Sequence, residues 1–114
     1  MVDECRTRQD FDALVASSYT RPMFIFKHST RCPISAGRWR EYENWAGKRG
    51  DVGFARVLVI EDRSVSSYVA ERSGVGHQSP QAILFYRGEP VWNASHWSIT
   101  EQDMAEAVRQ AASS

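Results

Sequence analysis

The sequence predicts an α/β fold in which a central mixed sheet of four strands is flanked by helices. The first observation is that short apolar runs alternate with longer segments of helical periodicity along most of the chain. The second is that these runs are rich in aromatic and β-branched residues, as buried strands are. The third is that only a turn separates the last two runs, which predicts an antiparallel hairpin.

Four apolar runs are expected to form the strands, because proline, glycine or polar residues bound each of them. Pro22 and Pro80 introduce the first and third runs, and a turn at residues 87–89 joins the last two. The expected strands are 23–26, 54–60, 82–86 and a run that begins at Val91. Helical connections make the early strands parallel, and the hairpin adds antiparallel strands.

Four segments are expected to form helices, because their apolar residues recur at helical spacing. They are 8–17, 34–46, 64–73 and a segment that opens at Thr100. Thr7 begins a capping pattern for the first helix, Ser64 is the expected N-cap of the third, and Gly47 and Gly74 end the second and third. The resulting order of helices and strands is that of a thioredoxin-like architecture.

Length and charge bound the function classes. The 114 residues fit a single thioredoxin-like domain over 1–114, with residues 1–7 expected as a flexible tail. Fourteen basic residues balance fourteen acidic ones, so no overall field draws in nucleic acid. We expect no secretory signal, and no apolar run approaches the roughly 20 residues that a membrane helix needs. We expect a cytoplasmic protein without nucleic-acid or membrane partners.

Cys32 is the candidate nucleophile. It follows a strand and a polar turn and starts a helix that has Pro33 at its first position. A sulfur there faces unpaired backbone N–H groups and the positive end of the helix dipole, which favours the thiolate. The thiolate is the attacking species in disulfide exchange, so Cys32 is expected to be catalytic. The candidate contacts of the thiolate or substrate are Lys27, His28, Arg31 and His77.

Ser35 occupies the place of the second cysteine in a dithiol C-x-x-C pattern. Cys32 can therefore form a mixed disulfide but cannot close a disulfide onto that neighbour. The expected cycle is monothiol, and an outside thiol must release what Cys32 carries. The Ser35 hydroxyl is a candidate hydrogen-bond donor to the thiolate.

Pro80 is the second element of the expected site. In a thioredoxin-like fold, the strand after the second βα unit begins with a cis-proline opposite the reactive cysteine, and the Ser79–Pro80 bond has that place. The backbone of Ser79 would pair with a disulfide partner as an added strand does. His77 and Gln78 would line the same edge.

These stretches resemble one family. Residues 26–35 and 76–85, together with 91–92 and 95–100, are similar to the YtxJ family of bacillithiol-associated monothiol bacilliredoxins. The resemblance implies a thioredoxin fold and removal of bacillithiol from S-bacillithiolated cytosolic proteins. It implies Cys32 as the reactive cysteine and Pro80 as the cis-proline. The co-substrate would be bacillithiol or another low-molecular-weight thiol, with no tightly bound cofactor.

Two other functions remain open at this stage. One is a glutathione-type monothiol glutaredoxin that holds an iron–sulfur cluster between two subunits, which Pro33 and Ile34 after the cysteine disfavour. The other is a non-enzymatic binding module on the same scaffold. Cys5 is either incidental or a resolving thiol. The three histidines match no familiar metal-ligand spacing, so no metal site is expected: His28, His77 and His96.

Overall fold

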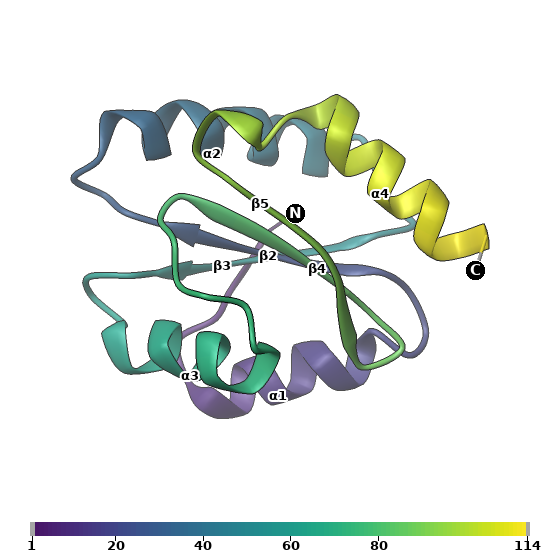
Figure 1. Ribbon diagram of the computed structural model, residues 1–114, viewed down its shortest axis with the longest axis horizontal. Coiled ribbons are helices and arrows are strands. Elements are labelled where there is room, and N and C mark those ends of the chain that lie inside the picture. Colours follow the sequence, from purple (N-terminus) through teal and green to yellow (C-terminus); the bar gives the residue numbers. More distant parts are fainter. Residues whose placement is uncertain (1, 114) are drawn as a thin grey trace.

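The computed structural model describes residues 2–113, and Figure 1 shows their arrangement in three layers. A sheet lies in the middle, helices α2 and α4 cover one of its faces, and helices α1 and α3 cover the other. The strands are β1 (Asp3–Glu4), β2 (Met23–His28), β3 (Gly53–Leu58), β4 (Gln81–Tyr86) and β5 (Glu89–Ser95). The helices are α1 (Arg8–Ser17), α2 (Pro33–Ala46), α3 (Arg63–Ser73), α4 (Glu101–Ser113) and the short 3-10 helix η1 (His96–Ser98).

The sheet is mixed and places β2 at its centre. The strand order is β1-β3-β2-β4-β5, in which β1, β3 and β2 run parallel while β4 is antiparallel to β2 and β5 to β4. Lys27 of β2 therefore lies between Val57 of β3 and Gln81 of β4. The thioredoxin-like α/β class is confirmed. Because β2 is the central strand, the turn that leads from β2 to α2 starts halfway along the edge where the strands end.

The expected number of strands is wrong, because the sheet has five strands rather than four. Asp3 and Glu4, expected within a flexible tail, pair with Ala55 and Arg56 of β3. The Arg56 Nε donates to both carboxylate oxygens of Glu4, at 2.8 and 2.6 Å, which ties the strand to the sheet. A two-residue strand shows no alternation, and its partner is distant in sequence, so no local pattern reveals it.

The helix signals were partly correct. The capping pattern of α1 is confirmed: the Asp10 amide donates to Thr7 Oγ1 at 3.0 Å, and the Thr7 amide donates to the Asp10 carboxylate at 3.1 Å. The expected N-cap of α3, Ser64, is wrong. Asp62 holds that position, and its backbone carbonyl accepts from two amides of the first turn. The Asp62 amide itself donates to the Leu58 carbonyl, which ends β3 before Ile60.

Side chains of β2 alternate between two cores. Phe24 and Phe26 belong to the core under α2 and α4, whereas Ile25 belongs to the core over α1 and α3. The strand continues through Lys27 and His28, which are 0% and 7% exposed, so the polar turn begins one residue later than expected. Buried polar side chains need partners, and these two direct attention to the end of β2.

No helix within residues 2–113 is long and apolar enough to cross a membrane.

Candidate active site

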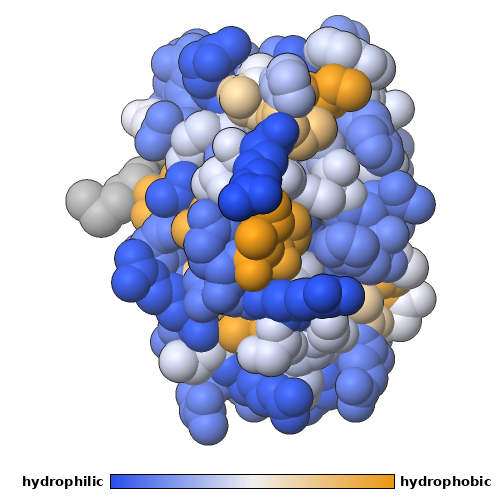
Figure 2. All heavy atoms as spheres, turned by 90° about the vertical axis from the view of Figure 1, so that its left-hand side faces the viewer, coloured by the Kyte–Doolittle hydropathy of each residue, from blue (hydrophilic) through white to orange (hydrophobic). Residues whose placement is uncertain are grey.

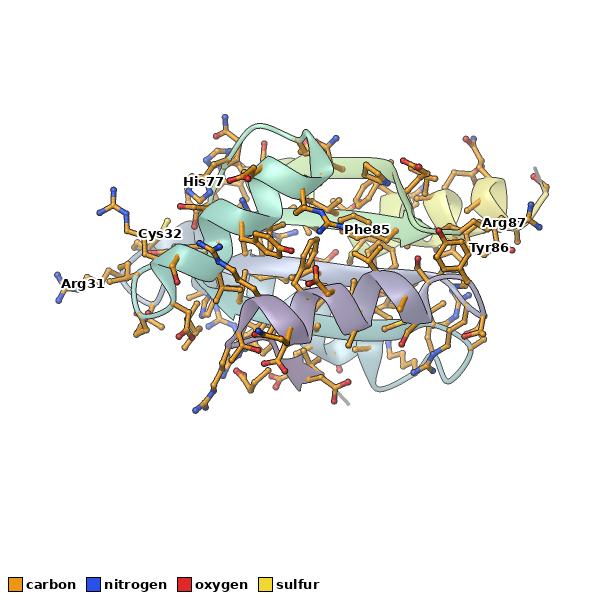
Figure 3. All side chains as sticks on the ribbon, turned by 90° about the horizontal axis from the view of Figure 1, so that it is seen from below. Arg31, Cys32, His77, Phe85, Tyr86 and Arg87 are labelled. Carbon is orange, nitrogen blue, oxygen red and sulfur yellow. The ribbon has the colours of Figure 1, made fainter. Side chains whose placement is uncertain are left out.

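Cys32 stands at the start of α2, at one end of the molecule (Figure 3). It is the N-cap residue, with φ −108° and ψ 119°, and Pro33 occupies the first turn. Its amide donates to the Ser29 carbonyl at 3.3 Å, and its carbonyl accepts from the Ala36 amide at 3.0 Å. The side chain makes no capping hydrogen bond and is partly exposed. The backbone is thus fixed on both sides of a residue that is partly exposed to solvent.

Ser35 is buried behind this turn and fixes it. Its hydroxyl accepts from the Ser29 amide at 3.0 Å and lies 2.7 Å from His28 Nδ1. Within residues 2–113, these are the hydrogen bonds of the Ser35 side chain, so it connects α2 to the end of β2 instead of contacting the Cys32 sulfur. The residue that replaces a second cysteine therefore has a structural place in this fold.

His28 lies on the α2 side of the sheet and is held by aromatic packing. Its ring stacks on Trp39, with centroids 5.4 Å apart and planes 25° apart, and the Arg56 guanidinium lies 4.6 Å from the centroid of Trp39. Burial lowers the pKa of His28, and the nearby charge of Arg56 lowers it further. His28 is therefore neutral at physiological pH and supplies no charge to the site.

Lys27 points to the other side of the sheet, where α3 packs. Its Nζ lies 3.1 Å from His77 Nδ1, and Ser66 Oγ of α3 lies 3.5 Å from the same ring nitrogen. Burial lowers the pKa of Lys27 to about 8, and burial followed by the charges of Lys27 and Arg63 lowers the pKa of His77. The structure thus brings together two of the four expected thiolate or substrate contacts, Lys27 and His77.

The Ser79–Pro80 peptide bond is cis, as the sequence predicts. Pro80 is buried, and its carbonyl accepts from the His96 amide at 3.0 Å, so the start of η1 is fixed against the start of β4. The Ser79 hydroxyl oxygen is buried and has no hydrogen-bond partner among the described residues. His96 has a φ of 56°, in the left-handed region that non-glycine residues rarely adopt, and lies where the chain turns toward α2.

Gln81 is a residue that sequence reasoning missed. It is buried beside Lys27, its Nε2 donates to the Gly76 carbonyl at 3.0 Å, and its Oε1 accepts from the Gln78 amide at 3.4 Å. The side chain therefore holds the loop before Pro80 in place. The signal that could have identified Gln81 in the sequence is its place as a polar residue directly before the apolar run 82–86.

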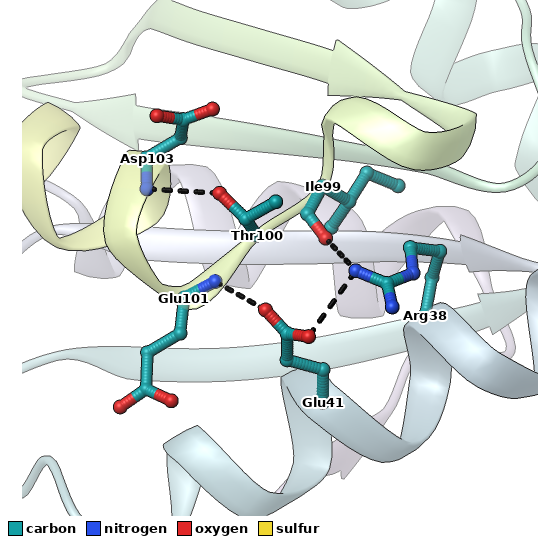
Figure 4. Close-up of polar contacts among 6 residues, drawn as sticks. All are labelled: Arg38, Glu41, Ile99, Thr100, Glu101 and Asp103. Carbon is teal, nitrogen blue, oxygen red and sulfur yellow. Dashed lines mark hydrogen bonds and ion pairs between the residues drawn. The ribbon is translucent and has the colours of Figure 1, made fainter.

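A polar network joins α2 to the segment that leads into α4 (Figure 4). Arg38 Nη1 of α2 donates to the Ile99 carbonyl at 2.7 Å and to Glu41 at 3.2 Å, and Glu41 accepts from the Glu101 amide at 2.6 Å. The same guanidinium lies 5.6 Å from the ring centroid of Trp97, which is 66% exposed. The segment from η1 to α4 is thereby joined to the helix that Cys32 begins.

The two cysteines have opposite environments. Cys5 is 3% exposed and packs in the core over α1 and α3. Burial, followed by the charges of Asp10, Asp62 and Glu4, raises the pKa of Cys5 to about 12, so its thiol is inert at neutral pH. Both cysteines are free. Cys32 is the partly exposed thiol, and Arg31 beside it extends into solvent (Figure 3).

None of the three histidines belongs to a cluster of candidate metal ligands among the described residues. No group of three or more His, Cys, Asp or Glu side chains within residues 2–113 is placed to hold a metal ion.

Comparison with known proteins supports the geometry. The family model of the monothiol bacilliredoxin BrxC matches residues 3–104. A solved protein described as a candidate oxidoreductase with a thioredoxin fold is 31% identical, with a TM-score of 0.85 over 93% of this chain and 92% of that one.

More distant solved structures share the fold alone. The thioredoxin of Fasciola hepatica is 18% identical, with a TM-score of 0.77 over 96% of this chain and 99% of that one. The thioredoxin of Trypanosoma brucei brucei is 16% identical, with a TM-score of 0.76 over 100% of this chain and 93% of that one. The family resemblance carried by residues 26–35 and 76–85 is confirmed. The chain therefore belongs to the monothiol bacilliredoxin BrxC family and is a thiol-disulfide oxidoreductase with a thioredoxin fold.

Proposed function

We propose that this chain removes bacillithiol from S-bacillithiolated cytosolic proteins through a mixed disulfide on Cys32. The observation that carries the proposal is the contrast between the two thiols. Cys32 is partly exposed at a helix start, while Cys5 is buried in the core behind the sheet. With Ser35 in the position of a second cysteine, the chain has no neighbouring thiol to resolve the mixed disulfide.

The proposed reaction has two exchange steps. The Cys32 thiolate attacks the bacillithiol sulfur, the bond between that sulfur and the substrate protein's sulfur breaks, and the protein thiolate leaves. A second low-molecular-weight thiolate then attacks the bacillithiol sulfur on Cys32, which releases a small-molecule disulfide and restores the Cys32 thiolate. Each step forms one S–S bond and breaks one, so neither needs a metal, a nucleotide or another oxidant.

The supporting roles are assigned to residues that hold the backbone around the sulfur. Pro33 sets the start of α2, and Ser35 fixes the turn before Cys32 through Ser29. Pro80 and the backbone of Ser79 offer an edge along which the substrate segment pairs as an added strand.

Mass spectrometry of the protein after reaction with an S-bacillithiolated substrate tests the proposal. We expect the mass of bacillithiol on Cys32 of the native chain and of Cys5→Ser, and no added mass on Cys32→Ser. A parallel reaction with a glutathionylated substrate distinguishes the glutaredoxin alternative, for which transfer of glutathione would be the faster. The proposed reaction would be excluded if neither bacillithiol nor glutathione were transferred to the chain, or if bacillithiol were still transferred to Cys32→Ser.

A further inference from the structure

A cavity of about 540 Å³ opens beside α3, and its polar side chains are those of an arginine, two serines and a histidine, set among apolar residues. Arg63, Ser66 and Ser67 of α3 line it together with His77 and the segment that follows β3. Among residues 2–113, no carboxylate side chain lines it. Its polar wall is therefore suited to an anionic group rather than to a cation.

Lys27 makes the positive character of this wall unusual. Its side chain is completely buried, and a buried ammonium is costly unless a carboxylate compensates it. Within residues 2–113, neither Lys27 nor Arg63 forms an ion pair with a carboxylate. Lys27 therefore carries a burial cost without an internal counter-charge, whereas Arg63 is exposed and free to meet an external anion.

The contact between Lys27 and His77 sets which ring nitrogen carries the hydrogen. An ammonium group has only donors, so the Lys27 Nζ donates to His77 Nδ1, and that nitrogen must accept. The neutral ring then carries its hydrogen on Nε2, which is a donor. Lys27 therefore positions His77 as a second donor at the cavity, beside the guanidinium of Arg63.

The cavity wall is joined to the turn that carries Cys32. The Val59 amide donates to the His28 carbonyl at 2.9 Å, and Thr30 Oγ1 donates to Glu61 at 3.1 Å. Cys32 and His77 lie at the same end of the molecule (Figure 3). Figure 2 looks onto this end and shows an apolar patch bordered by strongly hydrophilic side chains. A group attached to a small thiol on Cys32 is therefore at the same end of the molecule as this cavity.

We propose that this cavity is a carboxylate subsite that receives the anionic part of the low-molecular-weight thiol during transfer to Cys32, with Arg63 and His77 as binding residues and Lys27 as the positioning residue of His77. The proposal rests on the proposed function, because it needs a small thiol to reach Cys32. It commits to a carboxylate on the small thiol and not to one on the substrate protein.

Single-turnover transfer of three different thiols to Cys32 tests the subsite. The probes are mixed disulfides of one uncharged carrier peptide with mercaptosuccinate, 2-mercaptoethanol or cysteamine, which are dianionic, neutral and cationic. The carrier thiol is the leaving group in all three, so the ratio of rate constants reports recognition of the transferred thiol. We expect Arg63→Gln to lower the ratio of mercaptosuccinate to 2-mercaptoethanol about fivefold. Arg72→Gln, on the same helix but outside the cavity, should keep the native ratio.

Lys27→Met separates positioning from stability. A buried methionine removes the ammonium at similar volume, so we expect the thermal midpoint to stay or rise while the mercaptosuccinate ratio falls. A lower midpoint with an unchanged ratio would show that Lys27 is merely structural and would overturn its assigned role.

Three further outcomes decide between the proposals. An unchanged ratio in Arg63→Gln would overturn the subsite while leaving the proposed function intact. An acidic carrier peptide loaded with 2-mercaptoethanol that gains rate in an Arg63-dependent way, without any mercaptosuccinate effect, would assign the carboxylate to the substrate protein and overturn the proposal. Failure of every probe to modify Cys32 of the native chain would overturn the proposed function and the subsite together.

Discussion

At the scale of single residues, the site depends on polar groups that are buried with few partners. Ser35 is the clearest case, because one hydroxyl satisfies both the Ser29 amide and the His28 ring. In the sequence, this serine stands where a dithiol C-x-x-C pattern has its second cysteine. Here it also holds the backbone from which Cys32 projects.

Replacing Ser35 with alanine is expected to destabilise the chain by about 1–3 kcal/mol, because the Ser29 amide and His28 Nδ1 would lose a partner in a buried place. Urea unfolding measures the free energy. The matched control is Ser64→Ala, since Ser64 is exposed and does not cap α3, and it should change the free energy by less than about 0.5 kcal/mol. Equal losses in the two variants would show that the Ser35 hydrogen bonds contribute little.

Lys27 links stability to pH. Its folded-state pKa is lowered from 10.5 to about 8, so between these values the unfolded chain binds a proton that the folded chain does not. Stability should therefore rise with pH across this window, by about 2 kcal/mol between pH 7.5 and 9.5 relative to Lys27→Met. Urea unfolding of both proteins at several pH values measures the difference, in which the opposing effect of the raised pKa of Cys5 cancels. A difference independent of pH would contradict the burial of a titrating ammonium.

At the scale of elements, α2 connects Cys32 to two other parts of the fold, the end of β2 and the segment before α4. It begins at Cys32 and meets the end of β2 through Ser35. Farther along the same helix, Arg38 and Glu41 hold the segment that leads into α4 (Figure 4). The Glu41 carboxylate accepts from the first helical amide of α4, so one helix caps the next.

Glu41→Ala is expected to lower the free energy of unfolding by about 1–2 kcal/mol, because it removes this cap and the partner of Arg38. Relative to the native protein, amide hydrogen exchange in this variant should become faster in the first turn of α4 and stay unchanged in α1. The control is Glu43→Ala, because Glu43 is exposed on α2 and its carboxylate has no hydrogen bond to the part of the chain that the structure describes; this variant should leave exchange unchanged. Uniformly faster exchange in both helices would indicate a global effect and contradict a local cap.

At the scale of the whole molecule, the sequence predicts what is encoded locally. The bounds of α1 follow from a capping box of adjacent residues, and the place of Cys32 between β2 and α2 follows from an apolar run, a turn and a proline. The missed features join distant positions. Glu4 and Arg56 are 52 positions apart, and Lys27 and His77 are 50 apart, so no local pattern shows that they meet.

The same distinction separates the two halves of the candidate site. Cys32, Ser35 and Pro80 lie in recognisable patterns, and the structure shows Cys32 at the N-cap of α2 and a cis bond before Pro80. The cavity beside α3 depends on which face of β2 Lys27 occupies, and alternation in a strand that is buried on both faces does not reveal this in the sequence. In the sequence, nothing distinguishes Arg63 from an ordinary solvated arginine.

The burial of Cys5 gives the chain a built-in gauge of its own folding. Once Cys32 is blocked or replaced, the remaining sulfur reacts with a thiol reagent only when the layer between the sheet and α1 opens. The pace of that labelling then follows the opening equilibrium of the native molecule. Replacing Cys32 alone therefore gives a protein with one buried thiol, whose labelling reports opening without any introduced cysteine.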